Sequence, residues 1–182
     1  MTLYDVIVSD PPWDFKGNSE AKPGRNARGH YPCMPIEDIL ALPVGQWAAK
    51  QAVLYLWTTA PFLDLGLATL KVWGFQYKSM FVWDKERTAT GYWNRNEHEI
   101  VLIGRKGRFP PPAPEHRIGS VLRGQRREHS RKPDSLYAHL DAAYPDAVKL
   151  DMFSRETRPG WHQFGNEIDK FDDAAAIEAM LE

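Results

Sequence analysis

The stretch that decides the fold is VIVSDPPWDF, residues 6–15, where a short apolar run leads into an aspartate, two prolines and a tryptophan. Residues 6–8 favour a buried strand, and Pro11 and Pro12 end it because each fixes φ and lacks an N–H donor. An acid, fixed carbonyls and a flat indole at the end of a strand can hold a flat ligand that carries an amino group. The alternative is a turn whose aspartate acts as a cap and whose tryptophan joins the core.

The composition of the 182 residues predicts one globular domain spanning residues 1–182. Hydrophobic residues make up 43% and charged residues 26%, which is ordinary for a protein that buries a core. The formal net charge is −1, so any attraction to nucleic acid must come from a local patch. Cys33 is the single cysteine, which excludes a disulfide within the chain. The sequence has no signal peptide and no membrane-length apolar run, which predicts a cytoplasmic protein with no membrane partner.

Strand and helix patterns alternate along the chain. Continuous apolar runs predict strands buried on both faces over residues 4–9, 52–58, 77–85, 98–106 and 147–155. Apolar residues at helical spacing, with proline or glycine near several of the ends, predict helices over residues 35–43, 60–74, 132–144 and 172–182. This alternation predicts an α/β fold with a mainly parallel sheet, whose ligand crevice lies at the carboxyl ends of the strands.

Two long loops carry polar and basic sequence in place of apolar periodicity. Residues 14–30 begin at the DPPW turn, and residues 107–131 combine a proline tract with dense basic charge. Loops of this length in a compact domain are usually functional or disordered, and these two could close over a common site. Residues 105–132 hold nine Lys or Arg against two acids, and Arg25 and Arg28 add to this charge. Such a patch can neutralise phosphates, although a basic run is also typical of a solvated face.

The DPPW turn offers the groups that an adenine 6-amino group requires. A carboxylate and a backbone carbonyl facing that nitrogen would accept both of its hydrogens and favour pyramidal geometry as it attacks an electrophile. The indole would stack on the base, and no strong general base is needed because the proton can leave once the nitrogen is cationic. The predicted catalytic residues are therefore Asp10, Pro11, Pro12 and Trp13. The six histidines show no ligand spacing, so no metal site is predicted.

Six blocks of sequence, in order, resemble the MT-A70-type adenine N(6)-methyltransferases. They read VIVSDPPWDF, YLWTTAPFLDLGLATLKVWGFQ, FVWDK, HEIVLIGRKG, RREHSRKPDSLY and KLDMFSRETRPGWHQFGNEID, and the resemblance covers residues 4 to about 169. It implies a Rossmann-like class I methyltransferase fold with permuted motif order. The catalytic motif then comes first, and part of the site for the cofactor S-adenosyl-L-methionine comes last. This order accounts for the lack of a glycine-rich turn before the DPPW strand.

The same resemblance, together with the basic patch, assigns residues to the cofactor and to the substrate. The expected cofactor-binding residues are Asp10, Pro11, Lys132, Arg155, Asn166 and Glu167, the last two at the ribose and adenine. The expected substrate-binding residues are Tyr31, Lys85, Glu99, Arg25, Arg28, Arg123, Arg126 and Arg127. Simpler alternatives stay open: a glycine-containing turn for FGNE, a paired strand-end acid for Glu99, and solvated lysines for Lys85 and Lys132. Arg155 and Arg158 could meet the cofactor carboxylate, the nucleic-acid backbone or a neighbouring acid.

The expected substrate is DNA, because ETRPGW (residues 156–161) resembles the bacterial and phage form of the family. The same reaction on RNA is the nearest alternative. A catalytically inactive subunit that only binds nucleic acid would show degraded motifs, and both DPPW and GNE are intact. A small-molecule amine methyltransferase would leave the basic loops unexplained. The family also suggests a homodimer or a heterodimer with a paralogue, although a chain this short could act alone.

Overall fold

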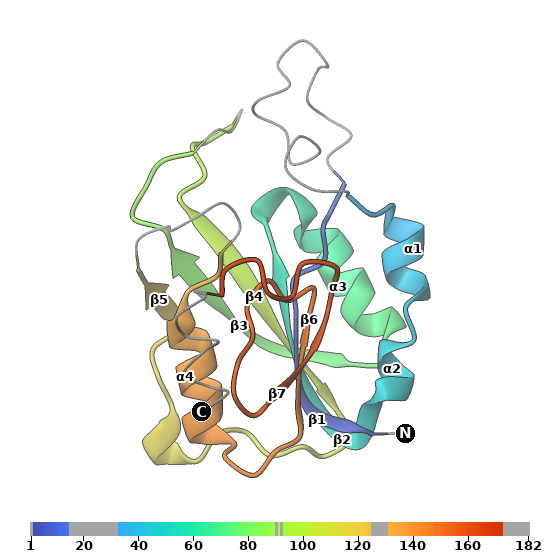
Figure 1. Ribbon diagram of the computed structural model, residues 1–182. Coiled ribbons are helices and arrows are strands. Elements are labelled where there is room, and N and C mark those ends of the chain that lie inside the picture. Colours follow the sequence, from blue (N-terminus) through green and yellow to red (C-terminus); the bar gives the residue numbers. More distant parts are fainter. Residues whose placement is uncertain (1, 15–32, 90, 92, 125–130, 173–182) are drawn as a thin grey trace.

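The computed structural model describes residues 2–14, 33–89, 91, 93–124 and 131–172. These residues form a seven-stranded sheet with the strand order β5-β3-β4-β2-β1-β6-β7 (Figure 1). The strands are β1 (Tyr4–Ser9), β2 (Ala48–Thr58), β3 (Gln76–Asp84), β4 (His98–Lys106), β5 (Val121–Arg123), β6 (Lys149–Met152) and β7 (Trp161–Phe164). The DPPW strand, β1, lies between β2 and β6. The turn that follows it therefore lies at the carboxyl ends of the central strands and not beside an edge strand.

Six strands run in one direction, and β4 alone among the described strands runs against them. β1 is parallel to β2 and β6, and β6 to β7, whereas β4 is antiparallel to both β2 and β3. The α/β class with a mainly parallel sheet is thus confirmed, but the parallel direction expected for residues 98–106 is wrong. A strand buried on both faces shows the same apolar run in either direction. The direction of β4 follows from the short connection over residues 85–97, because antiparallel neighbours can be joined by a hairpin whereas parallel ones need a longer crossover.

Three of the described α-helices lie within the predicted ranges 35–43, 60–74 and 132–144 but are shorter, and the helix over Val44–Trp47 was not predicted. They are α1 (Ile36–Ala41), α2 (Val44–Trp47), α3 (Leu63–Val72) and α4 (Asp134–Ala143), with 3-10 turns η3 (Ala60–Phe62) and η4 (Pro114–His116). Pro43 divides the predicted helix over 35–43 from α2, since it lacks the N–H that a continuous helix would use. The predicted stop at Gly74 is confirmed: it has φ +83°, and the Phe75 N–H donates to Leu70 O at 2.8 Å. The terminal helix predicted over 172–182 falls almost wholly outside the described residues.

Both faces of the sheet are buried, each by a different set of helices. Side chains alternate along β1: Val6 and Val8 join one core cluster with α4, and Ile7 joins the other. The second cluster packs against α1, α2 and α3 (Figure 1). Helix α3 approaches the sheet so closely that a Cβ on Gly104 of β4 would lie 2.7 Å from Leu70. The structure thus fixes β1 from both sides.

The structure describes most of one predicted long loop and little of the other. Residues 107–131 contain η4 and β5 and are therefore not a structureless loop where they are described. Strand β5 was missed because it is only three residues long and alternates in burial. Most of the loop over 14–30 lies outside the described residues. Within the described part of the chain, no helix is long and apolar enough to cross a membrane.

Candidate active site at the carboxyl edge of the sheet

The DPPW turn is held in place by backbone hydrogen bonds on both sides. The N–H of Asp10 donates to the carbonyl of Met152 at the end of β6 (3.3 Å), which ties the turn to the neighbouring strand. The Pro11 carbonyl accepts the N–H of Trp13 at 2.8 Å, and the Pro12 carbonyl accepts the N–H of Met34 at 2.9 Å. Each of these carbonyl oxygens has a second lone pair that can accept a further donor. The turn therefore presents Asp10 and the proline carbonyls in a fixed arrangement.

The side chain of Lys132 links two acids from different strands. Its Nζ lies 3.0 Å from Asp10 Oδ2 and 2.9 Å from Glu99 Oε2, and Lys85 Nζ lies 3.5 Å from Glu99 Oε1. Glu99 reaches this edge because β4 is antiparallel, which puts its first residues beside the ends of the parallel strands. The structure thus brings together Asp10, Lys85, Glu99 and Lys132, which the resemblance assigned to the cofactor and the substrate; those roles stay predictions. It also shows that Glu99 is paired and that the two lysines are not simply solvated.

Burial and charge shift the pKa values of this group in different directions. Burial raises the pKa of Asp10 above its usual range, although Lys132 acts to lower it. Burial would also raise the pKa of Glu99, but the Coulombic attraction of Lys132 and Lys85 outweighs it and leaves that pKa lowered. The pKa of Lys132 is raised despite its burial, because Asp10 and Glu99 both face its ammonium. Near neutral pH the group therefore contains a firmly charged lysine and an ionised Glu99.

Trp13 is a core residue in this structure. Its relative exposure is 8%, its indole N–H donates to the carbonyl of Trp57 at 3.1 Å, and its ring packs 6.0 Å from that of Phe62. The alternative reading of the sequence, in which this tryptophan joins the core, is therefore the arrangement in the structure. Stacking of this ring on a base stays a prediction. Trp57, which receives the hydrogen bond, also lies with its ring 5.1 Å from Lys132 Nζ.

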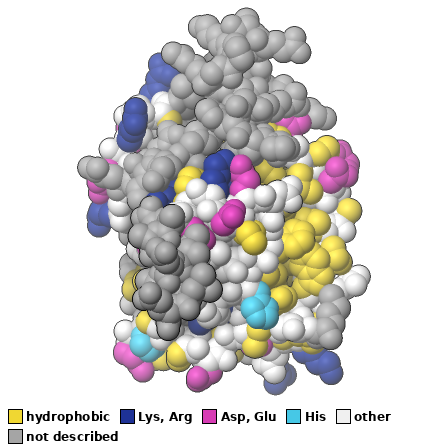
Figure 2. Space-filling view, viewed as in Figure 1, with side chains coloured by type: hydrophobic (Ala, Val, Ile, Leu, Met, Phe, Trp, Pro, Cys, Tyr) yellow, Lys and Arg dark blue, Asp and Glu magenta, His cyan; other side chains and the backbone are white. Residues whose placement is uncertain are grey.

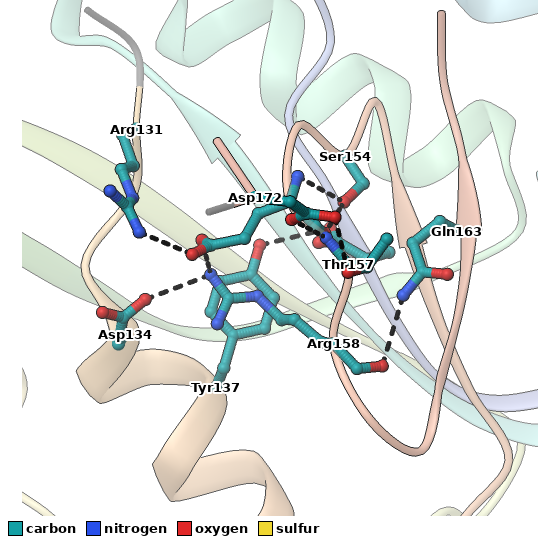
Figure 3. Close-up of polar contacts among 10 residues, drawn as sticks. Arg131, Asp134, Tyr137, Ser154, Thr157, Arg158, Gln163 and Asp172 are labelled. Atoms are coloured by element: carbon teal, nitrogen blue, oxygen red, sulfur yellow. Dashed lines mark hydrogen bonds and ion pairs between the residues drawn. The ribbon is translucent and has the colours of Figure 1, made fainter. Parts of the chain in front are cut away.

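A pocket opens beside Asp10, between the start of α4 and the segment that follows β6. It is lined by Asp10, Arg131, Lys132, Tyr137, Asp151, Phe153, Ser154, Arg155, Glu156, Arg158 and Phe171. Figure 3 shows Arg158 between acids from two segments: its guanidinium contacts Asp134 at 3.1 Å and Glu156 at 2.7 Å. The same guanidinium lies 3.7 Å over the ring of Tyr137. The pocket wall is therefore a connected network of charged and aromatic groups.

Asp151 is a buried acid at this pocket that the sequence reasoning did not select. Its relative exposure is 3%, and burial raises its pKa to about 7 despite a hydrogen bond from Ser154. The Tyr137 hydroxyl also donates to it, at 3.2 Å. Tyr137, Arg131 and Glu156 were missed as well. The available signal was an acid inside the apolar run of the last predicted strand, where a charge is unexpected unless it has partners.

The segment that contains FGNE folds back onto the pocket. Arg155 Nη2 lies 2.8 Å from Glu167 Oε2, and the Phe171 N–H donates to the Arg155 carbonyl at 2.9 Å. Asp172 accepts hydrogen bonds from the Thr157 N–H and hydroxyl at 2.8 and 2.7 Å (Figure 3). A Cβ on Gly165 would lie 2.9 Å from Ser154 O, so glycine allows this close approach. The structure places Arg155 in the pocket wall and Glu167 against it, while Asn166 is exposed.

The basic residues predicted to bind substrate are only partly described. Arg123 is exposed on β5 and pairs in register with Asp84, which precedes Lys85 at the site edge. Tyr31, Arg25, Arg28, Arg126 and Arg127 lie outside the described residues. Among the residues that are described, no group of three or more His, Cys, Asp or Glu side chains could hold a metal ion.

Comparison with known proteins matches this chain to one family along most of its length. A sequence model of the MT-A70 family matches residues 4–167. The chain is 29% identical to the Type II methyltransferase M.MunI of Mycoplasma sp over 91% of its own length and 78% of that protein. It is 30% identical to the Arabidopsis thaliana N(6)-adenosine-methyltransferase MT-A70-like and 28% identical to the Homo sapiens N(6)-adenosine-methyltransferase catalytic subunit METTL3. It covers 24% and 28% of those two proteins, again with 91% of its own length.

Proposed function

Because the chain belongs to the MT-A70 family, we propose that it is an S-adenosyl-L-methionine-dependent methyltransferase that methylates the 6-amino group of adenine in DNA. The observation that carries this proposal is the Asp10 carboxylate, fixed at the carboxyl end of β1 by Lys132 and open to a pocket. The family match supports methyl transfer, and the printed names of the two N(6)-adenosine-methyltransferases support adenine N6 as the acceptor. DNA is proposed on the sequence around residues 156–161.

In this proposal the DPPW turn holds the amine of the target base. The Asp10 carboxylate accepts one amino hydrogen and the Pro11 carbonyl accepts the other through its second lone pair, so that the nitrogen lone pair faces the pocket. Both acceptors are fixed before the base arrives, which favours the geometry of the reacting nitrogen over that of the flat, unreactive amine. The surplus proton leaves only after the nitrogen has become cationic. Asp10 therefore acts by orientation and charge and does not have to be a strong base.

The pocket beside Asp10 fits S-adenosyl-L-methionine by the chemistry of its lining. When bound, this cofactor supplies an electrophilic methyl group. It carries a carboxylate, an ammonium, ribose hydroxyls and a flat base, and the pocket offers cations, acids and the rings of Phe153 and Phe171. The Nε–H of Arg158 is buried and finds no acceptor among the described residues, so it can donate to a ligand. We propose Lys132, Arg155, Asn166 and Glu167, with Asp10 and Pro11, as the cofactor-binding residues.

RNA is the second candidate substrate, since relatives named as N(6)-adenosine-methyltransferases match 91% of this chain. The direct test is transfer of labelled methyl groups to DNA and RNA oligonucleotides of matched sequence, with the product nucleosides identified by mass spectrometry. We expect N(6)-methyladenine in the DNA. Label in RNA alone would replace the proposed substrate, and label in neither, with the cofactor bound, would support a catalytically inactive subunit of a homodimer or a paralogue heterodimer.

The role of Asp10 is tested by Asp10→Asn, which keeps the shape of the side chain and removes its charge. We expect methyl transfer to fall by at least about a hundredfold, which is typical of losing one fixed electrostatic contact to the reacting group. Asp146→Asn, an exposed position, is the matched control and should retain activity. Circular dichroism verifies that both variants are folded. Full activity in a folded Asp10→Asn variant would refute the mechanism.

A further inference from the structure

One tryptophan differs from the others in its exposure to solvent. All seven tryptophans lie among the described residues, and five of them are buried at relative exposures of 8% or less. Trp47 is partly buried against the core, whereas Trp93 is fully exposed, at 102%. Single exposed apolar side chains are common on protein surfaces, so the surroundings of Trp93 decide whether its ring marks a contact with another molecule.

Trp93 lies on a hairpin that rises from the candidate active site. The hairpin, residues 85–97, connects β3 to β4, and at its base the Lys85 N–H donates to Glu97 O at 2.9 Å. A further bond, from the Ala89 N–H to Asn96 O at 2.9 Å, continues the pairing toward the tip. Figure 1 shows this connection leaving the sheet at the end where β1 stops. Trp93 is four residues from Glu97, so it reaches at most about 14 Å beyond the base of the hairpin.

The side chains around Trp93 favour nucleic acid over protein as the occupant. Arg87 and Arg95 are exposed on the hairpin, and Arg123 on β5 lies in register with Asp84 at its base. Figure 2 shows Lys and Arg side chains on the upper left, where Figure 1 places the hairpin. The hairpin also carries two exposed acids, Glu86 and Glu97, against the three cations Lys85, Arg87 and Arg95. The Glu97 carboxylate accepts the Thr88 hydroxyl, and at the end of β3 the Asp84 carboxylate accepts the Glu86 N–H.

A protein interface centres on an apolar patch, whereas the described neighbours of Trp93 on this hairpin are mostly polar. An isolated aromatic ring among cations is typical of a surface that stacks bases while it neutralises phosphates. We propose that Trp93 is a stacking platform for a nucleobase that flanks the target adenine in the substrate nucleic acid. This inference rests on the proposed function and adds to it the place where a nucleotide beside the target adenine is bound.

The experiment combines protein variants with abasic oligonucleotides. Fluorescence anisotropy measures the affinity of wild type, Trp93→Ala and Trp93→Phe for a labelled single-stranded DNA that contains one adenine, and for copies in which each flanking base is removed in turn. Tyr77→Ala is the matched control, because Tyr77 is 44% exposed on β3 but lies near the strand's opposite end. Methyl transfer to the same oligonucleotides is measured in parallel.

We expect Trp93→Ala to bind the intact oligonucleotide about five- to a hundredfold more weakly, and Trp93→Phe to retain part of the affinity. Removing one particular flanking base should weaken wild type by a similar factor and have no further effect on Trp93→Ala. The salt dependence of binding should be the same in both proteins, since stacking neutralises no phosphate. Tyr77→Ala should bind like wild type.

Two results would overturn the proposal. One is that Trp93→Ala binds the intact oligonucleotide as tightly as wild type. The same conclusion follows if Trp93→Ala binds more weakly but the effect of removing each flanking base is the same in Trp93→Ala as in wild type. The other is a change of oligomeric state in Trp93→Ala with unchanged DNA binding, which would assign the ring to contact with a second copy. Failure of the proposed function is separable, because it appears as absence of methyl transfer by wild type to any DNA or RNA oligonucleotide.

Discussion

Replacing Lys132 by methionine tests whether the Asp10–Lys132–Glu99 group is a coupled, buried unit. The ammonium lies 3.0 Å from one carboxylate and 2.9 Å from the other, and the side chains of Lys132, Glu99 and Asp10 are 11%, 19% and 29% exposed. Lys132→Met keeps much of the length of the side chain and removes its charge. It leaves two carboxylates facing each other at the edge of the sheet, with Lys85 beside Glu99 alone.

The magnitude follows from these distances. At 3 Å and an effective dielectric constant of about 20, one such pair attracts with about 5 kcal/mol before desolvation is subtracted. Removing one partner of a buried pair lowers the free energy of unfolding by about 3–5 kcal/mol, because a buried charge is left uncompensated. We expect a loss in this range near pH 7. Lys170→Met is the control, since it removes a 2.6 Å contact to Glu167 that is exposed and contributes about 0–1 kcal/mol at most.

The pH dependence gives the sharper result. Without Lys132, the pKa of at least one of the two carboxyls rises in the folded protein, so protonation restores stability as the pH falls through that value. In wild type the pKa of Glu99 is lowered, so its contribution is lost only at lower pH. The difference in unfolding free energy between Lys132→Met and wild type should therefore shrink from about pH 8 to about pH 5. Urea unfolding followed by circular dichroism measures it. A difference that stays constant with pH, or one no larger than in Lys170→Met, would refute the reasoning.

Two further predictions concern buried groups near the site. Trp13→Ala should lower the free energy of unfolding by about 3–5 kcal/mol, because it removes a buried ring and its bond to the Trp57 carbonyl, whereas Trp93→Ala should leave stability unchanged. Equal urea unfolding midpoints for these two variants would contradict the core position of Trp13. Burial raises the pKa of Asp151 to about 7, so between about pH 4 and about pH 7 the folded protein holds a proton that the unfolded chain releases. The free energy of unfolding of wild type should therefore fall by at most about 4 kcal/mol as the pH rises from about 4 to about 7. Asp151→Asn should flatten that profile, and an unchanged slope would show that the acid is not responsible.

Much of the sheet could be predicted from the sequence because its strands are buried on both faces. The bounds of β1 and β4 match the predicted ranges 4–9 and 98–106, since apolar runs bounded by polar or turn residues define them without help from tertiary contacts. The direction of β4 could not be read from the same pattern. Strands β5 and β7 have three and four residues with mixed burial, so they depend on their neighbours and leave no pattern of their own.

The site was predicted less completely than the sheet. The DPPW turn at the end of β1 was found from residue types alone, whereas Lys85, Glu99 and Lys132 were joined to it only through the family resemblance. Their contacts connect segments far apart in sequence, which no local pattern reveals. Residue type could not decide whether Trp13 faces the core or the solvent, because either is ordinary for an indole after a strand. The exposure of Trp93 was likewise not predicted.

The central place of β1 also affects how the protein folds. Its first residues are paired on one side with β2 and on the other with β6, so that Val6 lies opposite Lys149. Residues near position 6 and residues near position 149 therefore pair in the middle of the sheet. Contacts between such distant segments close late because a long loop must first be ordered. The pocket is made of residues beside β1 and residues after β6, so it forms only when these distant segments have joined. We expect refolding on the slow side for a domain of this size, with the ability to bind a ligand appearing in the last phase and not with the first secondary structure.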